Sequence, residues 1–84
     1  MLDFFAISDE FSMIEISAPA EWIGKTMADL KLARSARIVA VAVRGQAEPG
    51  ERMQWRFPEP DAPFAAGEIV LLAGASNDLS RVQE

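Results

Sequence analysis

The chain is short and acidic: its 84 residues carry eight Lys and Arg against thirteen Asp and Glu, a net charge of −5. A chain this short forms one domain with a thin core, and its few cations disfavour binding to nucleic acid or to an anionic membrane surface. Cysteine and histidine are absent, which excludes disulfides, thiolate nucleophiles, the common zinc ligands and the usual proton-transfer group at neutral pH. We therefore expect no enzyme and no resident metal or cofactor. Half of the residues are apolar. A small domain of this kind often buries the apolar surface that its own core cannot cover against a second copy, so a homodimer is expected.

The N-terminal residues 1–10 are predicted to be a connecting segment, and residues 11–84 the domain itself. The first residues lack the cationic start and long apolar core of a signal peptide. No stretch approaches the roughly 20 apolar residues of a membrane helix, so a cytoplasmic protein is expected. Residues 11–18 alternate, with Ile14 and Ile16 on one face, which predicts a half-buried strand that ends at Pro19.

A short helix is predicted to begin after Thr26. The threonine is a good N-cap, and Asp29 stands three residues later in the first turn. Met27 and Leu30 share the inward face at i, i+3. We expect the helix to end within residues 32–33.

Three further strands are predicted. The run from Arg37 to Arg44 has six apolar residues between its arginines, which favours a central strand covered on both faces. Pro49-Gly50 indicates a turn, and residues 53–57 alternate as a short edge strand with Met53, Trp55 and Phe57 on one face. Prolines then make residues 58–63 irregular, and residues 69–73 form an apolar strand.

The end of the chain is predicted to be a helix. A glycine turn at Gly67 precedes the last strand and Gly74 breaks it, after which Ser76 or Asn77 caps a helix. Its inward residues are Leu79 and Val82, at i, i+3. The predicted order is β-α-β-β-β-α, an α+β domain with one small mixed or antiparallel sheet and two helices.

Few residues are candidates for catalysis, cation binding or phosphate binding. The acidic pairs Asp9/Glu10 and Glu59/Asp61 fall in polar or proline-rich loops, where solvated surface charge is favoured over catalysis or a loop cation site. Gly24-Lys25-Thr26 resembles the end of a phosphate-binding loop, but the glycine four residues earlier is missing. A tight turn is the better interpretation.

Three arginines are the candidate ligand-binding residues. Arg34 and Arg37 fall between the first helix and the strand that follows it, and Arg44 ends that strand. Guanidinium groups near a dimer cleft suit an anionic effector such as a nucleotide. Ordinary surface charge at the ends of elements is the alternative.

The stretches Trp22–Leu32, Ile38–Val43 and Phe64–Gly74, in this order and spacing, resemble the C-terminal regulatory domain of cytosolic potassium-transport subunits, the TrkA C-terminal or RCK C-terminal family. The resemblance implies a dimeric regulatory domain of a Trk/Ktr-type uptake subunit. Such subunits assemble on the inner face of a membrane potassium transporter or channel and gate it. Their small domain follows a Rossmann-type nucleotide-binding domain, whose G-x-G-x-x-G fingerprint is absent here. We therefore expect a C-terminal piece of such a subunit or a stand-alone relative.

The resemblance also implies an effector, because some relatives bind cyclic di-AMP in the dimer cleft. Those relatives have polar residues just after the first helix and early in the following strand, where this chain has Ala33 and Val39. Cyclic di-AMP or another nucleotide is thus a candidate effector, with cyclic di-AMP weakened by these two residues. The alternative is a purely structural dimerisation module, or a cytosolic domain of another ion or solute transporter.

Overall fold

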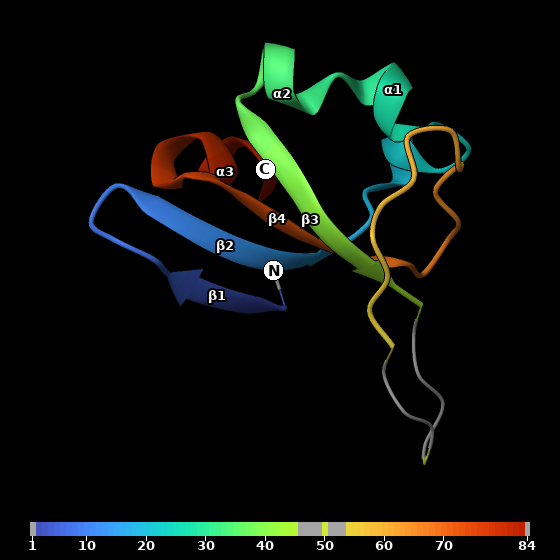
Figure 1. The fold of residues 1–84 in the computed structure, drawn as a ribbon, viewed down its shortest axis with the longest axis horizontal. Helices are drawn as coiled ribbons and strands as arrows, with labels where there is room; N and C mark the ends of the chain where they lie inside the picture. Colours follow the sequence, from blue (N-terminus) through green and yellow to red (C-terminus); the bar gives the residue numbers. More distant parts are fainter. Residues whose placement is uncertain (1, 46–49, 51–53, 84) are drawn as a thin grey trace.

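The computed structural model describes residues 2–45, 50 and 54–83 as a four-stranded antiparallel sheet with helices on one side (Figure 1). The strands are β1 (Asp3–Ala6), β2 (Phe11–Ser17), β3 (Ile38–Arg44) and β4 (Ile69–Ala75), in the order β1-β2-β4-β3. The helices are the 3-10 turn η1 (Ala20–Trp22), the short α1 (Met27–Leu30) and α2 (Leu32–Ser35), and α3 (Ser76–Gln83). The α+β class predicted from the sequence is confirmed.

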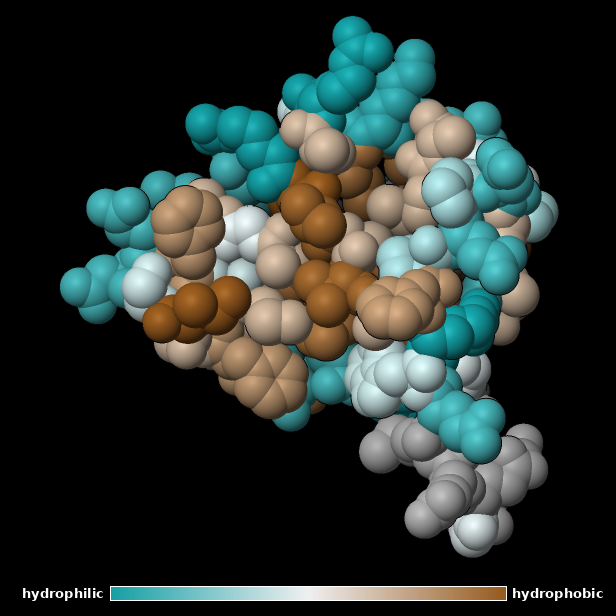
Figure 2. Space-filling model, viewed as in Figure 1, coloured by the Kyte–Doolittle hydropathy of each residue, from teal (hydrophilic) through white to brown (hydrophobic). Residues whose placement is uncertain are grey.

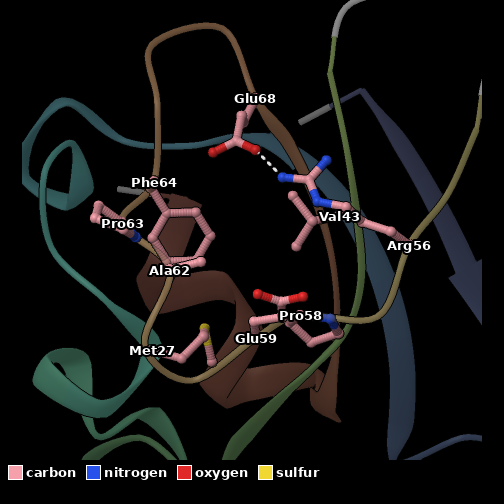
Figure 3. A pocket seen from close by; sticks show the side chains of 9 residues that line it. All are labelled: Met27, Val43, Arg56, Pro58, Glu59, Ala62, Pro63, Phe64 and Glu68. Carbon is pink, nitrogen blue, oxygen red and sulfur yellow. Dashed lines mark hydrogen bonds and ion pairs between the residues drawn. The ribbon is translucent and has the colours of Figure 1, made fainter.

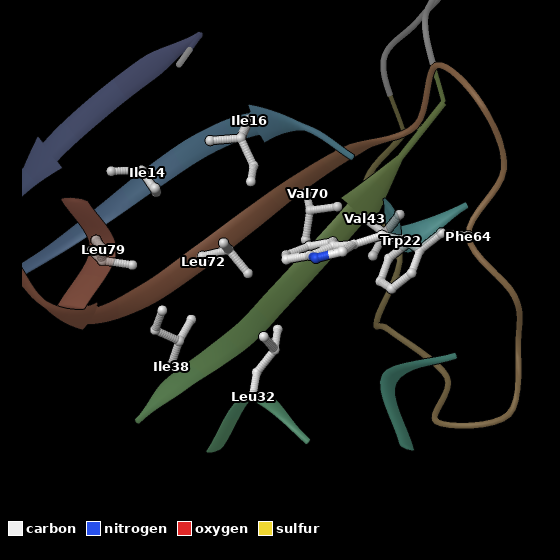
Figure 4. Packing of buried hydrophobic residues seen from close by; sticks show 10 residues of the cluster. All are labelled: Ile14, Ile16, Trp22, Leu32, Ile38, Val43, Phe64, Val70, Leu72 and Leu79. Carbon is white, nitrogen blue, oxygen red and sulfur yellow. The ribbon is translucent and has the colours of Figure 1, made fainter. Parts of the chain in front are cut away.

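The hydrophobic core lies between the sheet and the helices (Figure 4). Ile14 of β2, Leu72 of β4 and Ile38 of β3 are fully buried, and Leu79 of α3 packs against them. At the other end of the core, the rings of Trp22 and Phe64 lie 5.5 Å apart. We call this side of the sheet the inner face.

The opposite side, the outer face, carries apolar side chains that no helix of the described residues covers. Paired residues on neighbouring strands share a face, and the register places Phe5, Met13, Ala73 and Val39 in one row across all four strands. Leu71 lies in the next row on this face, beside Glu15. Figure 2 shows apolar side chains gathered over the strands on this side. We call these five apolar residues the outer patch.

Strand β3 lies at an edge of the sheet, so the prediction of a central strand covered on both faces is wrong. β4 pairs with both β2 and β3 and takes the central place. Burial along β3 broadly alternates, and Val39 is 58% exposed. The run is apolar on both sides because one side faces the core and the other contributes to the outer patch.

Strand β1 forms the opposite edge of the sheet. It lies within residues 1–10, which the sequence analysis predicted to be a connecting segment. Its four residues pair with β2, from Asp3 opposite Glu15 to Ala6 opposite Ser12. The sequence analysis missed this strand because its side chains are exposed on both faces, and no alternation marks such a strand.

The predicted first helix is divided in two. Thr26 and Asp29 form the expected capping box: the Asp29 N–H donates to Thr26 Oγ1 at 3.1 Å, and the Thr26 N–H to Asp29 Oδ2 at 3.0 Å. At Lys31 the backbone becomes left-handed, with φ 50°. This residue ends α1 and begins α2, so the helical region extends to Ser35 and past the predicted end.

The strand predicted at 53–57 is absent from residues 54–57. Arg56 makes one bridge to Val43, and Phe57 is 86% exposed. Prolines from residue 58 onward limit further pairing. Pro49 and Met53 lie outside the described residues, while Gly50 has φ 87°, as a turn requires.

The last strand and helix follow the prediction, with one extension. Gly67 has φ 84° as expected, but β4 continues through Gly74 to Ala75. A Cβ at Gly74 would lie 3.1 Å from the carbonyl oxygen of Arg37, so glycine here permits close approach of β3 rather than ending the strand. Leu79 and Val82 face the core as predicted.

Candidate effector-binding site

A cavity of about 250 Å³ lies where α1 and α2 meet the first half of β3. Its apolar lining includes Leu32 and Ile38, both buried. Two cations, Lys31 and Arg34, also line it, and none of the described acidic residues does. An apolar surface beside two positive charges suits a ligand with an apolar body and an anionic group. We call it the effector cavity.

The local sequence builds this cavity through the break between the two short helices. The left-handed Lys31 turns the chain between α1 and α2, and burial of Leu32 anchors α2 against the core. The carbonyl oxygen of Lys31 accepts from the Ser35 N–H at 2.9 Å and from the Ser35 hydroxyl at 2.9 Å. The sequence analysis missed Lys31, because nothing in the sequence marks a lysine that adopts a glycine-like conformation.

Ala33 and Val39, the two positions at which the resemblance implies polar residues, both line the effector cavity. Val39 also belongs to the outer patch, so the cavity and the patch meet at this residue. Neither side chain offers a hydrogen bond to a ligand. The polar contacts available from the lining side chains therefore come from the two cations.

Arg37 lies away from the effector cavity, at the turn between α2 and β3. Its guanidinium donates to Asp78 Oδ1 of α3 at 3.2 Å. Its backbone φ is 57°, a region that residues other than glycine seldom occupy. It lines a different cavity, beside α3.

Arg44 lies at the far end of β3, roughly 20 Å from Arg37 at about 3.3 Å per strand residue. It forms an ion pair of 2.9 Å with Glu15 of β2 across the outer face, and the two side chains are only 12% and 14% exposed. Its guanidinium carbon lies 5.1 Å from the ring centroid of Trp55, a cation–π contact. The three candidate arginines thus do not form one cluster: Arg34 lines the effector cavity, and the other two are paired with acids elsewhere.

A smaller cavity of about 90 Å³ lies between β3 and the proline-rich loop (Figure 3). Glu68 at its edge accepts from the Ala65 N–H at 2.6 Å and pairs with Arg56, and Glu59 also lines it. These bonds hold the loop to the sheet. Within the described residues, no group of three or more acidic side chains could hold a metal ion.

Gly24-Lys25-Thr26 does not form a phosphate cradle. The Gly24 N–H donates to the Phe64 carbonyl at 2.9 Å, and the Phe64 N–H donates to the Lys25 carbonyl at 2.9 Å. Gly24 has φ 83°, and Thr26 caps α1. The segment is the tight turn that the sequence favoured.

Comparison with known proteins gives the class of this domain. The family model of the TrkA-C domain matches residues 11–84. The chain therefore belongs to the TrkA-C domain family. No curated protein matches it.

Solved structures agree with this assignment. The chain resembles the RCK C domain of the potassium transport protein KtrA, solved in complex with cyclic di-AMP, with 27% identity and a TM-score of 0.69 over 89% of this chain and 82% of that one. The GsuK RCK domain structure shares the fold, with 21% identity and a TM-score of 0.67 over 89% of this chain and 16% of that one. Among the described residues, no helix has the length and apolar character needed to span a membrane.

Proposed function

We propose that this chain is a regulatory, dimerising and effector-binding domain of a cytosolic Trk/Ktr-type potassium-uptake subunit. In that role it acts at the inner face of the membrane, gates a membrane potassium transporter, and works with a Rossmann-type nucleotide-binding domain in the same subunit. The observation that carries the proposal is the TrkA-C match over residues 11–84, together with the likeness to the KtrA RCK C domain.

The outer patch supports the homodimer. Apolar side chains on an uncovered sheet face are the surface that a second copy would bury. The patch includes Val39 and Met13 on different strands, and the edge of β3 beside it is unpaired from Ile38 to Ala42 within the described residues. A dimer formed here would put the effector cavity of each copy next to the interface, because Val39 belongs to both.

This arrangement explains how an effector would regulate the domain. A ligand that binds the cavity only when the second copy is in place stabilises the dimer by mass action, by about 2.7 kcal/mol at a hundredfold excess over its Kd. Lys31 and Arg34 would hold its anionic group. Since Ala33 and Val39 offer no polar contact, we expect cyclic di-AMP to bind more weakly here than in relatives with polar residues at these positions.

The test is a thermal-shift and calorimetric titration of the folded chain with cyclic di-AMP, ATP and AMP. One of these should raise Tm saturably, and Arg34→Gln should reduce that shift. Lys25→Gln, which removes a cation outside the cavity, is the matched control and should leave it unchanged. A shift that both variants reduce equally would reflect net charge and contradict the site.

The second candidate is a purely structural dimerisation module, or a cytosolic domain of another ion or solute transporter. It is favoured by the apolar Ala33 and Val39, and by the ion pairs that occupy Arg37 and Arg44. A dimer that forms normally and shows no thermal shift with any of the three nucleotides would support it over effector binding.

A further inference from the structure

Two arginines and a buried aspartate lie beside a third cavity, between the start of β3 and α3. Arg37 donates to Asp78 Oδ1 at 3.2 Å, and Nη1 of Arg81, one turn further along α3, lies 4.0 Å from the same oxygen. The cavity has a volume of about 260 Å³, and Ser35, Ala36 and Val82 complete its lining. One water takes up about 30 Å³ in the liquid, so there is room for a group of several heavy atoms.

Among the described residues, the cationic side chains at this cavity outnumber the acidic ones. The side chains of Arg37 and Arg81 are 79% and 80% exposed, whereas that of Asp78 is 6% exposed. Each guanidinium has five N–H donors, and one carboxylate oxygen accepts from only a small part of them. The described lining of the cavity therefore carries one more positive than negative side chain, on a chain whose net charge is −5.

Asp78 restricts which anion could enter. Its Oδ2 is buried and has no hydrogen-bond partner among the described residues. A fully ionised anion is repelled by this carboxylate, whereas an anion with its own O–H can donate to it. A phosphate group has a second pKa near 6 in phosphoserine and keeps a proton in part of its population near neutral pH. Sulfate has no such proton.

The backbone at Arg37 adds an independent argument. Its φ of 57° favours glycine, and a strained residue is kept where the surrounding structure holds it, often at a binding site. The ion pair with Asp78 is one such restraint.

We propose that this cavity binds a phosphate group between Arg37 and Arg81, with the Asp78 carboxylate accepting a hydrogen bond from the phosphate O–H. The group is either orthophosphate or the phosphate of a small phosphomonoester. The site is separate from the effector cavity, and the inference does not depend on the regulatory function proposed above.

The test is an NMR titration of the folded chain with orthophosphate, sulfate, AMP and adenosine at constant ionic strength. Orthophosphate should shift the amide signals around Arg37 and Arg81 saturably, and sulfate should bind at least tenfold more weakly. Tighter binding of AMP than of orthophosphate at these signals identifies a phosphomonoester ligand, and equal or weaker binding identifies free phosphate.

Two variants separate binding from folding. Arg37→Gly removes the first cation, and glycine readily adopts the positive φ of this position. Arg81→Gln removes the second cation, whose side chain is exposed. Each should weaken orthophosphate binding at least tenfold with an unchanged circular dichroism spectrum, while Lys25→Gln should have no effect. Equal binding of phosphate and sulfate, no saturable shift, or binding that survives both variants would overturn the proposal.

Discussion

The two faces of the sheet carry similar apolar side chains but are used differently. On the inner face, Ile14 and Leu72 are fully buried beneath Leu79 of α3. On the outer face, Val39 and Met13 are covered by no helix in the part of the chain that the structure describes. The comparison separates two roles of apolar residues in a small domain: the inner face stabilises the single chain, and the outer face is the surface that we propose a second copy covers.

Polar groups differ between the faces as well. On the outer face, the largely buried Arg44–Glu15 pair joins β3 to β2 across β4. On the inner side, the hydroxyl of the buried Ser12 lies 2.8 Å from that of the half-buried Ser76, where α3 begins. An interface formed over the outer face would therefore bury an ion pair in which Nε of Arg44 has no hydrogen-bond partner among the described residues. A charge that is paired still costs less to bury than an unpaired one.

The largest effect is expected from truncation on the inner face. Leu72→Ala leaves a cavity in the core and should lower the free energy of unfolding by roughly 2–5 kcal/mol. Leu71→Ala, one residue away on the outer face, is the matched control and should cost clearly less at a concentration where the chain is monomeric. Urea unfolding followed by tryptophan fluorescence measures both, and equal losses would remove the distinction between the faces.

The next effect concerns the outer face alone. Val39→Glu places a carboxylate where the proposed dimer would bury it without a partner, so the dimer Kd should rise at least tenfold, or about 1.4 kcal/mol. Phe57→Glu, at a side chain that is 86% exposed, should leave the Kd unchanged. Light scattering over a dilution series measures both. A Kd that Val39→Glu does not alter would show that the patch is not the interface.

A smaller effect is expected at the N-terminus of α1, beside the effector cavity. Thr26→Ala removes the side chain that accepts from the Asp29 N–H and should cost about 1 kcal/mol of stability. Thr26→Ser keeps the hydroxyl and should retain most of the stability that the cap contributes. If alanine and serine behave alike in thermal unfolding, the cap does not stabilise the helix.

The smallest effect is a pH dependence at the same cap. Hydrogen bonds from the Thr26 backbone and side chain, aided by the Lys25 charge, lower the pKa of Asp29 below its ordinary value of 3.8. The lowered pKa contributes stability that is present above pH 3.8 and is lost as the pH falls through the folded-state pKa. Asp29→Asn should flatten that part of the stability profile between pH 5 and pH 2. A profile identical to that of the unaltered chain would contradict the contribution.

The sequence predicted those features that depend on local chemistry. The alternation around Ile14, the Thr26 cap, and the inward Leu79 each follow from the residues themselves, and all are confirmed. The place of β3 at the edge could not be predicted, because an apolar run looks the same whether a neighbouring strand, a helix or a second chain covers it. The division of the first helix at Lys31 could not be predicted either, because it depends on a backbone conformation that lysine seldom adopts.

The candidate site was predicted in part. Arg34 lines the effector cavity together with Ala33 and Val39, the two positions that the family resemblance singled out. Arg37 and Arg44 were grouped with Arg34 because they are near in sequence, but Arg37 precedes β3 and Arg44 ends it, so the length of that strand separates these two residues in space. Their acidic partners, Asp78 and Glu15, come from distant parts of the chain, so only the tertiary structure reveals these ion pairs.

The most direct test of the account is the mass of the chain in solution, measured by sedimentation equilibrium at micromolar concentration with and without the nucleotide that raises Tm. If the outer patch is an interface, the chain should sediment at about twice its 9.2 kDa, and the ligand should shift the equilibrium further toward the dimer. A mass of 9.2 kDa at every concentration and with every nucleotide would contradict the proposed dimer and its regulation together.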